Sequence, residues 1–304
     1  MMVEIAPMGG VNPNLGTVGG LKMPFIYDVG AAKIGVTPYL TDTQGAFYGY
    51  DLSSSGQVRA SRWSEERAGT SAQNYTGLAA GAATGLTFSA SSDMGYVALS
   101  RFSPNHGATA GTDAVQFRSN ALRLAATPTM GDWAMHIGLG HISGSNYVAT
   151  PGSAPTAAQL RDTKGTTLDF QAQGALGGKD ISIYANYGKS DAGSAARMNA
   201  YNGSRVTERK AFVIAADYSV IPHVLSIGAA YRAANTGKTA AQNTAGAGDK
   251  DNAFTIQAVY DLYQNVALHA VYKTQSGSAY NAGGTQSGAT VAKDLTTLML
   301  EVAW

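Results

Sequence analysis

The sequence predicts an all-β protein, a single transmembrane antiparallel up-and-down β-barrel of about 16 strands that takes in residues 1–304. Three observations lead to this prediction. Charged residues make up only 13% of the chain, whereas soluble domains contain about 25%. Apolar and polar residues alternate with a period of two in many short segments, as in a strand with one apolar face. The sequence contains no run of the ~18 apolar residues that a membrane helix needs.

The alternation is clearest in the last segment, residues 294–304. Its apolar residues share one face, and they are Leu298, Leu300, Val302 and Trp304. Glu301 falls on the opposite face, where a charge is tolerable if that face meets water in a lumen. This segment therefore predicts a final strand that separates lipid from water.

Going backward along the chain, seven pairs of alternating segments are joined by short turns that favour tight hairpins. The turns lie near residues 30–32, 53–56, 91–95, 127–132, 177–180, 219–223 and 263–265. Residues 3–6 are a candidate first strand that would pair with the last. Because the fifth to seventh strands are irregular, 14 and 18 strands remain open.

The connections alternate between short and long, apart from the one near residues 41–45. The long ones are rich in Gly, Ala, Ser, Thr and Asn, and they lie roughly at 8–22, 64–84, 102–114, 142–166, 190–209, 233–252 and 275–292. Outer-membrane barrels have short periplasmic turns and long extracellular loops. The spacing therefore predicts a barrel with its short turns in the periplasm.

Aromatic residues gather at the two ends of the predicted strands, where membrane barrels carry girdles. The predicted girdle consists of Tyr27, Tyr50, Trp133, Tyr187, Tyr218, Tyr231, Tyr260, Tyr272 and Trp304. A soluble β-sandwich has the same alternation but no reason to sort tyrosine to strand ends. The sorting favours the membrane barrel.

Composition excludes several classes of protein. The absence of cysteine excludes disulfides and thiolate metal sites. A net charge of +1 gives no reason to expect nucleic-acid binding. The first residues resemble no signal peptide, so we expect that one has been removed before Met1.

The C-terminal strand Leu298–Trp304 and the hairpin Tyr260–Tyr272 resemble those of the Gram-negative porin superfamily. The resemblance implies passive diffusion of ions and small hydrophilic solutes through the bacterial outer membrane. It also implies recognition of the last strand by the barrel-assembly machinery, and a homotrimer. The acidic Pro-Glu-Phe-Gly-Gly motif that such porins carry on their third loop is absent from this sequence, which puts the usual constriction in doubt.

The residues opposite the apolar face are expected to line the pore, because charge on the lipid face costs about 2–4 kcal/mol at the midplane. The candidates for the lining or a constriction are Arg59, Glu65, Glu66, Arg123, Asp169, Asp217, Arg232, His269, Lys273 and Glu301. If the long loop over residues 63–78 folds inward, Glu65 and Glu66 could oppose Arg59 and Arg123. The alternative is that these charges pair with one another in a polar wall or lie on an exposed loop.

Enzymatic function is not predicted. The five histidines are scattered without metal-ligand spacing, and no nucleophile elbow or phosphate-binding loop occurs in the sequence. We expect no cofactor and no metal. Two alternatives to a porin stay open: a barrel that sheathes or anchors a partner such as an electron-transfer protein, and a barrel-embedded hydrolase.

Overall fold

The computed structural model describes residues 2–4, 20–41, 72–78, 83–104, 117–147, 160–238, 249–277 and 294–302. Within these ranges the chain forms 17 strands and a five-residue helix, α2 (Ala72–Thr76). The strands are β1 (Met2–Glu4), β2 (Gly20–Lys22), β3 (Phe25–Val29), β4 (Ala32–Thr41), β5 (Ala83–Ser92), β6 (Gly95–Ser103), β7 (Ser119–Ala126), β8 (Thr129–Met130), β9 (Trp133–Tyr147), β10 (Leu160–Asp162), β11 (Gly165–Leu176), β12 (Lys179–Ser190), β13 (Arg209–Ile221), β14 (Leu225–Asn235), β15 (Asn252–Tyr263), β16 (Val266–Ser276) and β17 (Asp294–Val302).

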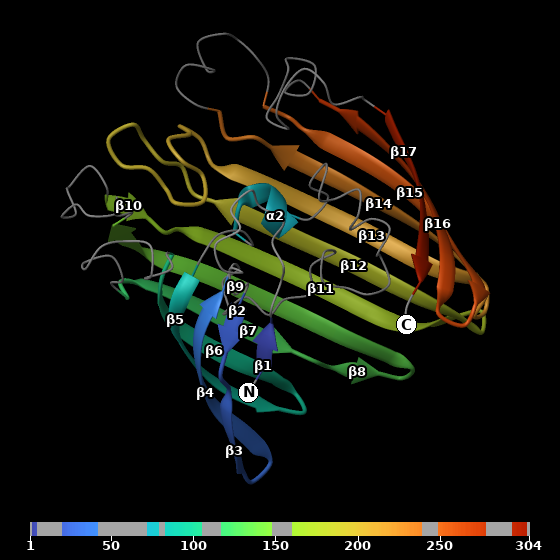
Figure 1. The fold of residues 1–304 in the computed structure, drawn as a ribbon, viewed down its shortest axis with the longest axis horizontal. Coiled ribbons are helices and arrows are strands. Elements are labelled where there is room, and N and C mark those ends of the chain that lie inside the picture. The colour runs from blue at the N-terminus through green and yellow to red at the C-terminus, as the bar shows by residue number, and fades with distance from the viewer. Residues whose placement is uncertain are drawn as a thin grey trace, which may run out of the picture.

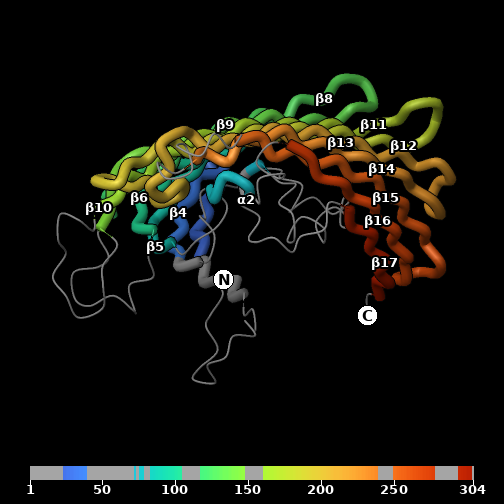
Figure 2. Tube along the Cα trace, turned by 90° about the horizontal axis from the view of Figure 1, so that it is seen from above, coloured from blue at the N-terminus to red at the C-terminus, as the bar shows by residue number. Residues whose placement is uncertain are grey.

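All strand pairs are antiparallel, and neighbours in sequence are neighbours in the sheet, so the predicted all-β up-and-down architecture is confirmed. The sheet curls into an arch, and β17 forms one of its edges (Figures 1 and 2). Among the described residues, the paired registers run from β1 to β17 and do not continue from β17 back to β1.

Several short strands continue a neighbour after a brief interruption. β2 and β3 both pair with β4, while β7 and β8 both pair with β9. β10 and β11 also share β9 as their partner. Merging these three pairs leaves fourteen strand positions in the described part of the sheet, one of the numbers that the sequence left open.

The sequence predicts a hairpin around residues 53–56, which would stand between β4 and β5 in the sheet, but no strand lies between these two. β4 pairs directly with β5, from Lys33 opposite Ser91 to Thr41 opposite Ala83. The intervening predicted strands near residues 48–60 lie outside the described residues. The described part of the chain between β4 and β5 includes α2.

The alternation of short and long connections is as predicted for the other hairpins. Two- or three-residue turns join β3 to β4, β5 to β6, β11 to β12, β13 to β14 and β15 to β16, whereas the connections at the opposite end are long. Gly177 and Gly178, with φ of 61° and 73°, make the tight turn between β11 and β12. We call the two ends of the sheet the short-turn end and the long-loop end.

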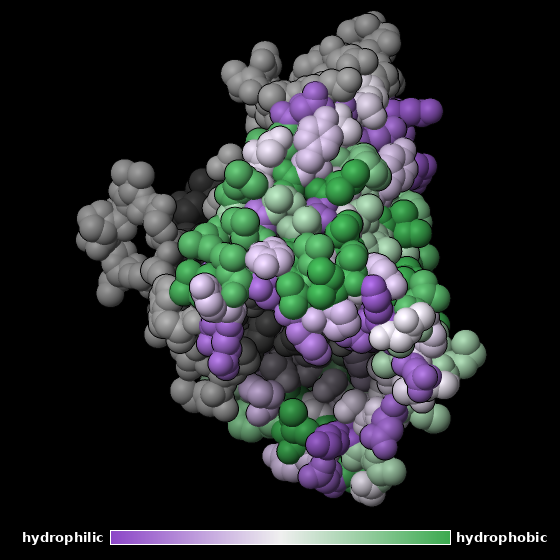
Figure 3. Space-filling model, turned by 90° about the vertical axis from the view of Figure 1, so that its right-hand side faces the viewer, coloured by the Kyte–Doolittle hydropathy of each residue, from purple (hydrophilic) through white to green (hydrophobic). Residues whose placement is uncertain are grey.

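Side chains alternate strictly between the two faces of the sheet. On β13, Phe212, Ile214 and Ala216 are exposed while Val213 and Ala215 between them are buried. The exposed set continues across the convex face with Ile227, Ile256, Leu268, Leu298 and Leu300. Figure 3 shows apolar side chains gathered in a band on one side of the molecule, bordered by hydrophilic ones. This is the face that needs an apolar environment.

α2 lies on the concave side of the arch, against β12 and β13 (Figures 1 and 2). Tyr75 and Ala72 pack there on small residues that point inward, namely Ala211, Val213, Ala215, Ala230 and Ala234. The described end of the predicted inward-folding loop, residues 72–78, is therefore attached to the inner wall.

Candidate functional site

The charged residues predicted to line the pore lie on the concave face wherever the structure describes them. Six are at least nine-tenths buried, namely Arg123, Asp169, Asp217, Arg232, His269 and Lys273, and Glu301 is half-buried. Arg59, Glu65 and Glu66 lie outside the described residues. Their opposition to Arg123 across a constriction stays a prediction.

Arg123 on β7 belongs to a buried charge cluster with Asp169 on β11 and His136 on β9. Its guanidinium donates to both carboxylate oxygens of Asp169, at 2.5 and 2.7 Å, and its Nε donates to the Tyr96 hydroxyl at 3.3 Å. His136 Nε2 lies 3.2 Å from Asp169 Oδ1. A Cβ on Gly138 would lie 2.0 Å from the guanidinium, so the glycine makes room for it. Bidentate pairing at full burial fixes this cluster as part of the wall.

A second cluster attaches α2 to the wall. The Tyr75 hydroxyl donates to Asp251 Oδ2 at 3.2 Å, and Arg232 donates to Asp251 Oδ1 at 2.8 Å. The guanidinium carbons of Arg232 and Arg209 lie 4.6 and 4.8 Å from the centroid of the Tyr75 ring, within range of cation–π attraction. Burial and the Asp251 carboxylate raise the pKa of the Tyr75 hydroxyl, so it stays protonated and keeps donating.

Glycines on the inner wall allow α2 to lie close to it. The Ala72 amide donates to Asn186 Oδ1 on β12 at 3.1 Å. A Cβ on Gly188 would lie 2.7 Å from the Ala72 carbonyl oxygen and 2.8 Å from Thr76 Oγ1. Side chains at this position would therefore displace the helix, which makes Gly188 part of its seat.

Basic residues predominate on the concave face beside α2. Arg232 on β14 stands opposite Ala253 on β15, and Lys273 on β16 stands opposite Thr255, two residues farther along the same strand. Arg209 on β13 and Arg232 flank the Tyr75 ring, and Lys273 lies within electrostatic range of Arg232 and Asp251. We call Arg209, Arg232 and Lys273 the basic patch.

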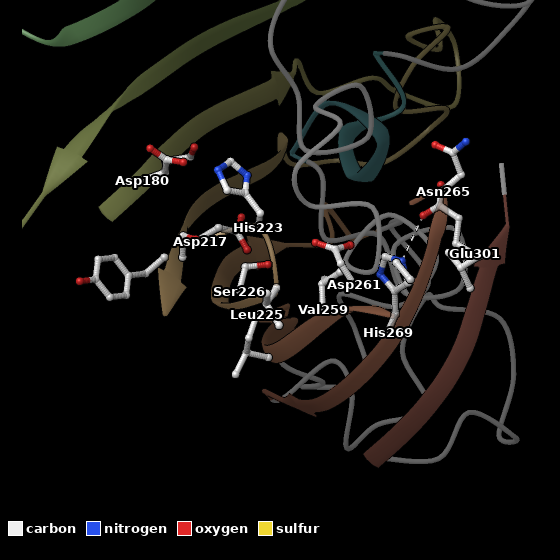
Figure 4. Close-up of a pocket in the computed structure, with 16 residues that line it drawn as sticks. Asp180, Asp217, His223, Leu225, Ser226, Val259, Asp261, Asn265, His269 and Glu301 are labelled. Atoms are coloured by element: carbon white, nitrogen blue, oxygen red, sulfur yellow. Dashed lines mark hydrogen bonds and ion pairs between the residues drawn. The ribbon is translucent and has the colours of Figure 1, made fainter. Parts of the chain in front are cut away.

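The short-turn end of the concave face has the opposite character. A cavity of about 500 Å³ opens there between β12 and β17, and its lining includes Asp180, Asp217, Asp261 and Glu301. Figure 4 shows these carboxylates carried by different strands around one space, with His269 bonded to Glu301. The distance from His269 Nε2 to Glu301 Oε2 is 3.1 Å. We call this space the acidic vestibule.

The predicted girdle residues that the structure describes lie on the convex face. They are Tyr27, Trp133, Tyr187, Tyr218, Tyr231, Tyr260 and Tyr272, while Tyr50 and Trp304 lie outside the described residues. Trp133 lies over Gly174 of β11, where a Cβ would be 2.5 Å from the indole. The Tyr218 hydroxyl donates to the Leu176 carbonyl at 3.4 Å near the short turns.

In the part of the chain that the structure describes, no group of three or more His, Asp or Glu side chains is arranged to hold a metal ion. No helix in the same ranges is long and apolar enough to cross a membrane.

Sequence reasoning missed several residues of these clusters. Asp251 falls in the long connection predicted over residues 233–252, yet it is buried between Arg232 and Tyr75. Tyr75 was treated only as part of a loop. The available signal was the run of small residues at inward positions of β13 and β14, which leaves room for a packed segment.

No family model and no curated protein matches the chain. Three solved outer membrane proteins resemble it in structure. The outer membrane channel DcaP of Acinetobacter baumannii has a TM-score of 0.47 at 11% identity, with 84% of this chain and 78% of that chain covered. The outer membrane protein opdK of Pseudomonas aeruginosa has a TM-score of 0.47 at 12% identity, with 93% and 70% covered. OmpT, an outer membrane protein of Vibrio cholerae in its trimer form, has a TM-score of 0.30 at 15% identity, with 85% and 86% covered.

Proposed function

We propose that this chain is a porin-like channel of the bacterial outer membrane through which ions and small hydrophilic solutes diffuse passively. One observation carries the proposal: the sheet sorts its side chains into an exposed apolar convex face and a polar, charged concave face. A wall of this kind separates hydrocarbon from water, and its strands satisfy the backbone hydrogen bonds that lipid cannot.

The concave face supplies what a selective aqueous path requires. Fixed charges of both signs lie on it, and they occupy different positions along the strands: the basic patch beside α2, and the acidic vestibule at the short-turn end. Rings of charge in a pore act on permeating ions through their field. α2 lies on the same face, where it narrows the space that the arch encloses. The proposed function involves no catalytic step.

The proposal includes assembly into a homotrimer and recognition of the last strand by the barrel-assembly machinery. Small outward residues support close packing between copies, since Ala216 stands opposite Ala229 and Ala258 opposite Ala270 on the convex face of β13–β16. Replacing Ala229 with tryptophan would obstruct such an interface. The mass of the purified variant, measured by light scattering, should then fall to that of a monomer, and an unchanged oligomer would contradict this interface.

Conductance in planar bilayers tests the channel directly. The purified, folded protein should insert in steps of uniform, stable conductance that rises with salt concentration. A protein that is folded and inserted yet carries no current would contradict the proposal. Such silence would instead favour a barrel that sheathes a partner.

A further inference from the structure

We propose that the acidic vestibule binds organic cations of the aliphatic ammonium class, with Asp217 as the principal recognition residue. The inference rests on the proposed function, because it names a class of solute for the same channel. It is carried by the cavity, by an unsatisfied buried carboxylate oxygen, and by the mixture of charge and aliphatic surface in the lining.

The side chain of Asp217 is held in place by its neighbours. Only 8% of the residue is exposed, and its Oδ1 accepts a hydrogen bond from Gln257 Nε2 at 2.5 Å. The carboxylate lies across Gly228 of β14, where a Cβ would be 2.0 Å from Oδ1. Gly228 and Gln257 thus fix the orientation of the carboxylate before any ligand arrives.

The second carboxylate oxygen of Asp217 has no partner in the described structure. Oδ2 is buried and accepts no hydrogen bond, although Asp217 lines the vestibule. Buried polar groups are normally hydrogen-bonded, because burying a polar group without a hydrogen-bond partner costs free energy. A donor that enters the vestibule and displaces the atoms covering this oxygen would satisfy it, and a cationic donor would do so more strongly than a neutral one.

The other charges around the vestibule favour a cation as well. Asp180, Asp261 and Glu301 share the lining, and none of the described lining residues is lysine or arginine. One cation lies beside the lining: Lys179 donates to the Val220 carbonyl oxygen and lies over the ring of Tyr218, which lines the vestibule. Two histidines, His223 and His269, also line the vestibule, and His269 bonds Glu301. Four carboxylates therefore face the vestibule against the single lysine beside it, an excess of negative charge that favours a cation.

The size and the apolar part of the lining favour an organic ion over a bare metal ion. The volume of about 500 Å³ falls within the range of small-molecule sites. Val224, Leu225 and Val259 contribute aliphatic surface beside the carboxylates. The carboxylates do not converge into a metal-binding group. A short alkyl chain that ends in ammonium groups matches both kinds of surface.

The test uses putrescine as the probe and its neutral counterpart, 1,4-butanediol, as the matched ligand. Titration calorimetry on the folded full-length protein should show saturable binding of putrescine and none of the diol. Asp217→Asn keeps an oxygen for Gln257 but removes the charge, so it should weaken putrescine binding by at least about tenfold. Glu208→Gln removes a carboxylate outside the vestibule, where Glu208 bonds Lys210, and should leave binding unchanged.

Two readouts separate this inference from the proposed function. The role of the vestibule is overturned if the wild type and the Asp217→Asn variant bind putrescine with equal affinity. It is also overturned if Glu208→Gln weakens putrescine binding as much as Asp217→Asn does. Absence of putrescine binding in a protein that conducts ions overturns it too, while the channel proposal stands. Binding without any conductance contradicts the channel proposal and leaves the ammonium site intact.

Discussion

Replacing Ile214 with lysine tests whether the convex face of the sheet meets lipid. Ile214 lies in the middle of β13 with 45% of its surface exposed, between Ala185 on β12 and Tyr231 on β14. Complete burial of an isoleucine contributes about 1.5–3 kcal/mol, so covering this exposed share with lipid contributes about 1 kcal/mol. A lysine at the bilayer midplane costs about 2–4 kcal/mol more. The variant should therefore lose about 3–5 kcal/mol in the free energy of unfolding.

The same substitution at the end of the same strand provides the control. Ile221 is also exposed, and it lies seven residues, about 23 Å along the strand, from Ile214. Near the interface a lysine costs about 0–1 kcal/mol, because its ammonium group reaches water. Urea unfolding of both variants in phospholipid vesicles measures the difference. Equal losses for Ile214→Lys and Ile221→Lys would refute a lipid-facing convex surface.

Three further substitutions test the concave face. Asp169→Asn should lower the free energy of unfolding in urea by about 3–5 kcal/mol, because it leaves the Arg123 guanidinium buried without its counter-charge. Asp28→Asn breaks an exposed ion pair, and an equal loss from this variant would contradict the reasoning. Gly188→Leu should displace α2 and raise the single-channel conductance, so unchanged conductance in the folded variant would count against α2 as a narrowing element. Tyr75→Phe keeps the ring between two guanidinium groups but removes a hydrogen bond, and it should cost about 1 kcal/mol with little change in conductance. A large gain in conductance would instead show that this single bond holds the helix.

The strands could be predicted from the sequence because apolar residues that recur at every second position are typical of a β-strand with one apolar face. The hairpin from Phe254 to Tyr272 was assigned with the correct turn and faces, since Ile256 and Leu268 are exposed while Gln257 and His269 are buried. The strands predicted near residues 48–60 lie outside the described residues and stay a prediction. Their place in the strand order could not be predicted from alternation, because β4 pairs directly with β5 and no strand lies between these two in the sheet.

Inward orientation could be predicted for single charges, but their partners could not. Asp217 and Arg232 were assigned to the lumen because a charge is costly in lipid. That argument gives no distances, so it did not foresee that Arg123 joins Asp169 across three strands or that Asp251 lies against Tyr75. Register and curvature of the sheet decide these contacts, and both depend on pairings between residues far apart in the sequence.

The most direct test of the central claim is an accessibility scan along β15 in lipid bilayers. The chain contains no cysteine, so single cysteines can be introduced and spin-labelled at residues 254–258 without removing native thiols. Collision with oxygen, which concentrates in the hydrocarbon, should be high at Phe254, Ile256 and Ala258 and low at Thr255 and Gln257. Uniform values along the strand, or a water-soluble relaxing agent that reaches Ile256 as readily as the loops, would contradict the division of this sheet between lipid and water.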